Sequence, residues 1–211
     1  MTADLPPTGP GPGLRSNPGF DDVELDRRTA LHMRTARLVL RTLRPSDADR
    51  VSSILSQPDV GRMLGQIHLP YLVDEARRWL ESHEEERARG TAYRFGAVLD
   101  DRVIGCADIG AIAEQTGELG FWFDPACWGQ GYAREAATAV VRFAFAGLEI
   151  RRLTATRASD NERSARLLKT LGFRETGQRQ AWSHSRRATV TQIAYDLIAP
   201  AGPFGLPGAP A

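Results

Sequence analysis

A glycine-rich stretch near the middle of the chain holds the residues whose types and spacing best suggest chemistry. Gly129 and Gly131 lie within Asp-Pro-Ala-Cys-Trp-Gly-Gln-Gly-Tyr-Ala-Arg-Glu-Ala, residues 124–136, between an apolar strand-like run and a helical pattern that begins near Ala133. Glycine adopts backbone angles closed to other residues, so successive N–H groups can turn toward one ligand. Because the next helix presents unpaired N–H groups and its positive dipole end there, the stretch predicts a pyrophosphate site.

Taken alone, the stretch is equally compatible with an ordinary glycine turn. Other nucleotide motifs fit less well. The chain has no Gly-Lys-Ser/Thr sequence for a P-loop here, and it lacks the third glycine and the correctly spaced acidic residue of a Rossmann fingerprint.

Four motifs together resemble a known family. Trp128-Gly-Gln-Gly-Tyr-Ala133 resembles the acetyl-CoA pyrophosphate loop of the GNAT acetyltransferases, Gln/Arg-x-x-Gly-x-Gly/Ala, with tryptophan in place of the usual first residue. Three further segments are similar to the ribosomal-protein N-terminal (Rim) branch: Arg37-Leu-Val-Leu-Arg41 with Asp47-Ala48, Glu118-Leu-Gly-Phe-Trp122, and Asn161-Glu-Arg-Ser164 running to Leu171-Gly-Phe173. The resemblance spans nearly the whole chain between its two tails. It implies an acetyl-CoA-dependent N-acetyltransferase that acts on a primary amine by direct transfer. The branch favours a protein N-terminus, and a homodimer is compatible with it.

The resemblance also implies where acetyl-CoA binds. In this family the strand before the loop separates from its neighbour, its backbone binds the pantetheine arm, and one N–H faces the thioester oxygen. The corresponding backbone groups here are those of Phe121, Trp122 and Phe123. The pyrophosphate would lie on Trp128, Gly129, Gln130, Gly131, Tyr132, Ala133 and Arg134. Asn161 would reach the pantetheine arm, and its alternative role is to cap the following helix.

Acetyl transfer to an amine requires a base, because amines are mostly protonated at neutral pH. Glu118 is the first candidate because it is the only carboxylate on the strand that would align the acyl group; alternatively it is a solvated charge at a strand start. Asp108, within the apolar run Gly105–Ile109, is the second candidate; the alternative is a solvent-facing residue of an alternating strand.

The departing thiolate raises the question of a general acid. Many members of the superfamily use a tyrosine five residues before the phenylalanine of Leu-Gly-Phe, and Leu168 stands there in this chain. Ser164 is the substitute that the branch pattern suggests, although a thiol of pKa about 8.5 can leave unaided. Cys127 beside the loop is a weaker candidate for a covalent nucleophile, since no histidine lies near it in sequence.

Composition describes an ordinary globular protein of 211 residues with a net charge of +1. Near-neutrality gives no reason to expect direct nucleic-acid or membrane partners. The two cysteines and four histidines show no metal-ligand spacing, so no metal is expected.

No segment is typical of a signal peptide or a membrane span, which makes a cytoplasmic location the expectation. Residues 1–33 and 200–211 are predicted to be disordered tails around one domain, 34–199.

The periodicities predict a mixed α/β protein with a mostly antiparallel central sheet and flanking helices, in an order that coincides with the GNAT fold. Residues 59–72 are expected to be an irregular connection. The expected strands are 37–43, 93–99, 102–112, 118–123, 150–156, 173–179 and 188–198, and the expected helices follow Ser46, Asp74, Ala133 and Asn161.

Two other functions remain open on the sequence. One is acetylation of a small amine, such as an aminoglycoside, a polyamine or an amino acid, which an acidic acceptor groove would favour. The other is a non-catalytic acyl-CoA-binding module, to which the missing tyrosine gives weight. The acceptor groove is expected to lie between the first two helices and the connection 180–188.

Overall fold

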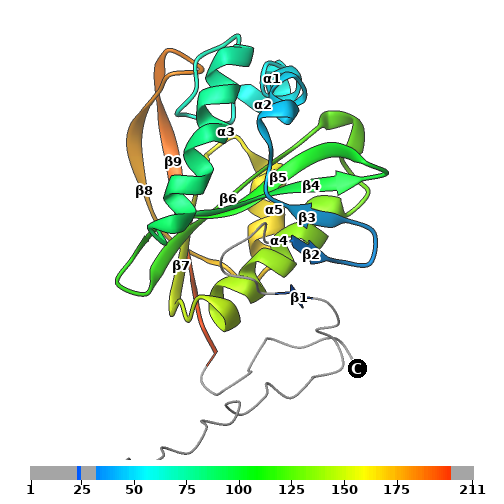
Figure 1. Ribbon diagram of the computed structural model, residues 1–211. Helices are drawn as coiled ribbons and strands as arrows, with labels where there is room; N and C mark the ends of the chain where they lie inside the picture. Colours follow the sequence, from blue (N-terminus) through cyan, green and yellow to red (C-terminus); the bar gives the residue numbers. More distant parts are fainter. Residues whose placement is uncertain (1–22, 25–31, 201–211) are drawn as a thin grey trace, which may run out of the picture.

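The computed structural model describes residues 23–24 and 32–200, arranged around one twisted sheet (Figure 1). Nine strands form this sheet in the order β1-β2-β3-β4-β5-β6-β7-β9-β8. All neighbours are antiparallel except β6 and β7, which run parallel. The predicted mixed, mostly antiparallel architecture is therefore confirmed. Most of the tails predicted at 1–33 and 200–211 lies outside the described residues.

The first part of the chain supplies one edge of the sheet and three helices. The strands are β1 (Val23–Glu24), β2 (His32–Arg34) and β3 (Val39–Arg41), and the helices are α1 (Ala48–Leu55), α2 (Pro58–Gly61) and α3 (Val73–Ala88). The expectation of an irregular connection over 59–72 was wrong at its beginning, because α2 lies there. Pro58 is its first residue, where the missing N–H of proline costs nothing.

The middle of the chain forms the predicted antiparallel meander. Its strands are β4 (Tyr93–Leu99), β5 (Arg102–Ala113) and β6 (Thr116–Phe123). The register opposes Asp108 to Gly120 and Gly110 to Glu118, and it shifts between Gly110 and Ala113. This register places Asp108 and Glu118 on one face of the sheet.

The last part of the chain completes the sheet. Helix α4 (Tyr132–Arg142) continues as a π turn, Phe143–Gly147, and is followed by β7 (Arg152–Ala158), α5 (Glu162–Thr170), β8 (Arg174–Ser183) and β9 (Ala188–Ile198). These elements match the predicted order. Strand β8 extends to Ser183, beyond the predicted end at 179, because it pairs with β9 up to Ala188.

Two apolar cores cover the two faces of the sheet. On one face, α4 and α5 pack through Ala136, Val140 and Leu168 onto side chains such as Ile109 and Phe123. On the other face, α1 and α3 pack through Val51, Ile54 and Leu80 onto Cys106 and Trp122. Adjacent residues of β6, Trp122 and Phe123, thus point into different cores, as the alternation of a strand requires. No helix within residues 32–200 is long and apolar enough to cross a membrane.

Candidate active site

Strands β6 and β7 separate at the centre of the sheet. Their parallel pairing covers only three positions and ends where Glu118 lies beside Thr154. Beyond that point the backbone of residues 119–123 has no strand partner on the β7 side within the described part of the chain, while its pairing with β5 continues. Unpaired backbone donors and acceptors need partners, so this edge can bind an extended polar ligand. The separation expected for the strand before the loop is confirmed.

The glycine-rich loop lies at the end of this open edge. Gly129 and Gly131 have φ angles of 77° and 82°, which only glycine adopts without strain. Gly131 is the N-cap of α4, so the N–H groups of the first helical turn meet those of the loop. The Asp124 carboxylate accepts a hydrogen bond from the Ala126 amide and pairs with Arg50, and these contacts fix the start of the loop. The arrangement has the donors and the dipole orientation that an anion requires.

A cavity of about 700 Å³ joins the open edge to the loop. Its lining includes most of the residues that the resemblance assigned to acetyl-CoA: Phe121, Trp122, Phe123, Trp128, Gly129, Gly131, Tyr132, Ala133 and Asn161. Gln130 and Arg134 do not line it. The Gln130 carbonyl instead accepts a hydrogen bond from Arg37, and the Arg134 side chain is exposed.

Trp128 stands where the family pattern has glutamine or arginine. Its indole N–H donates to the Phe123 carbonyl at 2.9 Å, which ties the loop to the end of β6. The Arg163 guanidinium lies 4.4 Å from the centre of its ring. Trp128 therefore acts as a platform that holds a cation at the cavity wall.

The cavity has opposite charges on different elements. Basic side chains come from β4, β7 and α5, namely Arg94, Arg157, Arg163 and Arg166, whereas carboxylates come from α2, β5 and β6, namely Asp59, Asp108 and Glu118. The sequence analysis did not select any of these four arginines. The spacing of Arg163 and Arg166 around Ser164, on one side of a helix, was a usable signal; nothing near Arg157 in the sequence pointed to it. Arg157, Arg163 and Arg166 suit a polyanionic ligand, whereas Arg94 is already paired with Glu86 and Asp108.

Asp108 is the most perturbed carboxylate of the cavity. Its residue is only 9% exposed, so its interpretation as a solvent-facing residue was wrong. Burial raises its pKa to about 6, although Arg94, whose Nη1 lies 3.3 Å from Oδ1, acts in the opposite direction. Arg94 is held in turn by Glu86 on α3, at 2.7 Å. A carboxylate with a pKa near 6 is poised to accept a proton at neutral pH.

The backbone of β6 makes room for this carboxylate. Gly120 lies directly opposite Asp108, and a Cβ at Gly120 would lie 3.0 Å from Asp108 Oδ1. The Asp108 carboxylate therefore lies against the peptide backbone of β6, within the stretch that has separated from β7. This placement brings a titratable group to the open edge.

Glu118 also lines the cavity, in a more open position. It is partly exposed, and its Oε1 accepts a hydrogen bond from the Thr156 hydroxyl at 3.0 Å. It lies at the last paired position of β6 and β7, so it marks the point at which the two strands separate.

The remaining candidates lie at different distances from the cavity. Ser164 lines it, and its backbone N–H donates to the Asn161 side chain, which caps α5. Leu168 is 1% exposed and belongs to the core between α5 and the sheet. Cys127 lines the cavity, but burial and the nearby Asp124 raise the pKa of its thiol, which disfavours a thiolate nucleophile. No group of three metal-ligating side chains occurs within the described ranges.

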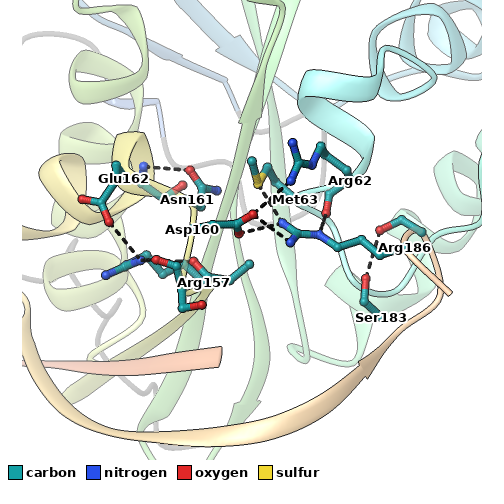
Figure 2. A network of polar contacts seen from close by, with 12 residues as sticks. Arg62, Met63, Arg157, Asp160, Asn161, Glu162, Ser183 and Arg186 are labelled. Carbon is teal, nitrogen blue, oxygen red and sulfur yellow. Dashed lines mark hydrogen bonds and ion pairs between the residues drawn. The ribbon is translucent and has the colours of Figure 1, made fainter. Parts of the chain in front are cut away.

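A cluster of polar contacts joins three connecting segments, one of which lines the cavity at Met63. This Asp160 cluster comprises Arg62, Met63, Asp160 and Arg186 (Figure 2). Arg186 donates to both carboxylate oxygens of Asp160, at 2.9 and 2.8 Å, and to the Arg62 carbonyl at 2.7 Å. The segment after α2, the end of β7 and the β8–β9 turn are thereby held together. Arg186 joins the connection 180–188 to Met63, which lines the cavity, and the role of this connection as a border of the acceptor groove stays a prediction.

Comparison with known proteins identifies the family. The sequence profile of the acetyltransferase (GNAT) domain matches residues 37–174. The chain belongs to the GNAT acetyltransferase family. The p20 protein of Bacillus licheniformis, named an uncharacterized N-acetyltransferase, is 27% identical over 169 residues, which are 78% of this chain and 94% of that protein.

Solved structures show the same fold. RimJ of Mycobacterium smegmatis, in complex with a CoA disulfide, has a TM-score of 0.72 and 21% identity, covering 81% of this chain and 87% of RimJ. RimL, described as a ribosomal L7/L12 alpha-N-protein acetyltransferase in complex with coenzyme A, has a TM-score of 0.69 and 19% identity, covering 78% of this chain and 95% of RimL. The protein is therefore a GNAT N-acetyltransferase with the fold of these enzymes.

Proposed function

We propose that this GNAT enzyme transfers the acetyl group of acetyl-CoA directly to a protein N-terminal α-amine. The observation that carries the transfer reaction is the open edge of β6, which leads from the glycine-rich loop to the buried Asp108 carboxylate. The choice of a protein N-terminus is supported by the fold shared with RimL, which is named for that activity. Acetyl-CoA supplies the activated acetyl group.

The residues around the cavity fit acetyl-CoA. Loop N–H groups at Gly129 and Gly131 and the start of α4 suit the pyrophosphate. The backbone groups of residues 121–123 that face away from β5, apart from the Phe123 carbonyl that Trp128 occupies, suit the amide-bearing pantetheine arm. Arg163 and Arg166 add positive charge for the ribose phosphate of coenzyme A, which is separate from the pyrophosphate. Asn161, although it caps α5, also lines the cavity and presents its amide there.

Asp108 is our proposed general base, with Glu118 as the group that receives the incoming ammonium. Asp108 has the pKa suited to proton removal at neutral pH and lies against the backbone of Gly120, where the acyl group would be aligned. Glu118 lies two residues earlier on the same face, with its hydrogen bond to Thr156 fixing its orientation. An ammonium ion held by Glu118 can transfer its proton to Asp108 directly or through a water molecule.

The leaving thiolate needs little assistance from the protein. Leu168, at the position of the family tyrosine, is sealed in the core and has no acidic proton. Ser164 lines the cavity and is our proposed hydrogen-bond donor to the sulfur. Because a thiol with a pKa of about 8.5 is a tolerable leaving group, loss of the Ser164 hydroxyl should slow the reaction much less than loss of the base.

One observation favours a second candidate function. Asp59, Asp108 and Glu118 line the cavity, with Arg94 as the counter-charge of Asp108, and the remaining carboxylates favour an acceptor with more than one positive charge. A polyamine or an aminoglycoside would meet this requirement. A peptide whose N-terminus is followed by a basic residue would also meet it.

The test is a thiol-release assay with acetyl-CoA and a matched acceptor panel. The panel contains peptides with free and blocked N-termini, spermidine and an aminoglycoside, each assayed with wild-type protein, Asp108→Asn and Glu118→Gln. Release with free N-termini alone, lost in Asp108→Asn, is the expected result. Turnover of small amines alone would move the function to the second candidate. Tight binding of acetyl-CoA without turnover of any acceptor would make the protein a binding module.

A further inference from the structure

Arg37 lies between β2 and β3 and contacts the glycine-rich loop from outside the cavity. It begins the Arg-Leu-Val-Leu-Arg motif, yet it is absent from the cavity lining. Its Nη1 donates to the Gln130 carbonyl at 2.9 Å, its Nε donates to Glu135 Oε2 at 2.7 Å, and its guanidinium lies 4.4 Å from the centre of the Tyr132 ring. One side chain thus contacts the loop and the first turn of α4 together.

The hydrogen bond to Gln130 fixes the direction of one peptide plane. In a trans peptide the C=O and the following N–H point in opposite directions. Because the Gln130 carbonyl points to Arg37, outside the cavity, the Gly131 N–H points to the opposite side. Gly131 lines the cavity whereas Gln130 does not, which agrees with this orientation. Arg37 therefore turns a donor of the loop toward the site of the pyrophosphate.

Glu135 holds Arg37 in place and would otherwise oppose anion binding. Its carboxylate accepts hydrogen bonds from the Arg37 backbone N–H at 2.7 Å and from the Thr35 hydroxyl at 2.6 Å, besides the ion pair with the guanidinium. Burial raises the pKa of Glu135, but these hydrogen bonds and the Arg37 charge outweigh it and lower the pKa overall. A negative charge in the first turn of α4 would repel a pyrophosphate, and Arg37 neutralises it.

The fit between Arg37 and the loop is close. A Cβ at Gly131 would lie 3.4 Å from Arg37 Nη2, so the guanidinium packs directly on the residue that opens α4. The partners lie about one hundred positions apart in the chain, which makes this contact a tertiary support for the loop rather than a local turn.

We propose that Arg37, anchored by Glu135, is a positioning residue that holds the loop in its anion-binding conformation and thereby sets the affinity for the pyrophosphate of acetyl-CoA. The inference rests on the proposed function. It concerns a part of the co-substrate distant from the reacting thioester, so its consequences differ from those of losing a catalytic group.

The experiment compares two acetyl donors, of which one carries the pyrophosphate with its nucleotide and the other lacks both. Acetyl-CoA and S-acetylpantetheine are assayed with wild-type protein, Arg37→Gln and Glu135→Gln, and coenzyme A binding is measured by titration calorimetry. We expect Arg37→Gln to weaken coenzyme A binding and raise the KM for acetyl-CoA by about tenfold or more, as for one lost charge-assisted hydrogen bond. With S-acetylpantetheine, kcat/KM should change less than about twofold. Glu135→Gln should shift both quantities in the same direction by a smaller factor.

Arg41→Gln is the matched control. Arg41 lies four residues further along the chain, at the end of β3, and forms a comparable ion pair with Asp47 at 2.8 Å, outside the cavity lining. We expect this variant to have the wild-type KM for acetyl-CoA and the wild-type kcat/KM for S-acetylpantetheine. Thermal unfolding of all variants separates loss of fold from loss of affinity, and Glu135→Gln serves if Arg37→Gln does not fold.

The outcomes separate this inference from the proposed function. Equal losses with both donors, or unchanged coenzyme A affinity in Arg37→Gln and Glu135→Gln, would overturn the positioning role alone. A wild-type protein that binds no coenzyme A would overturn the proposed function together with this inference.

Discussion

Replacing Asp108 by asparagine should stabilise the protein while removing most of its activity. The wild-type carboxylate is buried, and at pH 8 it is charged in a place where burial favours the neutral form. Asparagine has nearly the same shape and no charge. The same substitution removes the proposed base, so the rate of acetyl transfer should fall about 100- to 10,000-fold.

The pKa gives the size and the sign of the stability change. A rise from 3.8 to about 6 on folding means that the folded state binds the proton more tightly. Above pH 6 the charged carboxylate therefore costs the folded state about 3 kcal/mol, and this cost disappears as the pH falls to about 4. Asp108→Asn should raise the free energy of unfolding by up to about 3 kcal/mol at pH 8 and by almost nothing near pH 4. The figure is an upper bound, because the amide must replace the carboxylate as the partner of Arg94.

Urea unfolding at pH 8 and pH 4, followed by tryptophan fluorescence, measures this difference. Asp47→Asn is the control of opposite sign: burial raises the pKa of Asp47, but Arg41 and the Arg44 backbone lower it overall, so that variant should lose stability at pH 8. In the wild type, kcat/KM should fall about tenfold per pH unit below pH 6, as the base becomes protonated. A variant that is less stable than the wild type at pH 8, or that keeps the wild-type rate, would refute the reasoning.

Three further predictions concern the loop, the Asp160 cluster and a buried histidine. Gly131→Ala places a side chain at a φ of 82°, so coenzyme A affinity should fall about five- to tenfold by calorimetry, whereas Gly177→Ala, which meets nothing within 4 Å, should leave it unchanged. Asp160→Asn weakens the contacts of Asp160 with Arg62 and Arg186, and it should raise the acceptor KM up to about fivefold with less effect on the KM for acetyl-CoA. Because exposed ion pairs contribute at most about 1 kcal/mol, a larger rise of the acceptor KM would contradict this explanation. His83 is buried with both ring nitrogens lacking hydrogen-bond partners in the described structure, and burial lowers its pKa from 6.5 to about 4, so His83 alone should contribute a loss of about 3 kcal/mol of stability between pH 6.5 and pH 4, opposite in sign to the gain from Asp108. His83→Leu should remove that loss in urea unfolding, and an unchanged pH dependence would show that another group is responsible.

The elements were largely predictable because their signals are local. Strand β4 occupies 93–99 as expected, and the meander of β4, β5 and β6 followed from runs of apolar residues separated by short turns. Helix α2 was missed because a four-residue helix has no full period of apolar residues, and its proline reads equally as the end of α1. The short strands β1 and β2 were missed for a similar reason, since two or three residues show no alternation.

The sequence by itself determined the family, the order of the elements and the glycine-rich loop. Each depends on residues close together in the chain, and a positive φ at Gly129 or Gly131 can be foreseen from glycine alone. The same reasoning placed Glu118 and Ser164 at the cavity.

Only the tertiary structure decided which carboxylate is perturbed and what supports the loop. The alternation of β5 places Asp108 on one of two faces, but it does not say that α3 and Arg94 cover that face, or that Gly120 lies opposite. The contacts of Arg37 with Glu135 and of Arg186 with Arg62 join residues 98 and 124 positions apart. A pKa and a loop conformation depend on the charges and the packing within a few ångströms, and those neighbours are fixed by the way the chain folds rather than by the local sequence.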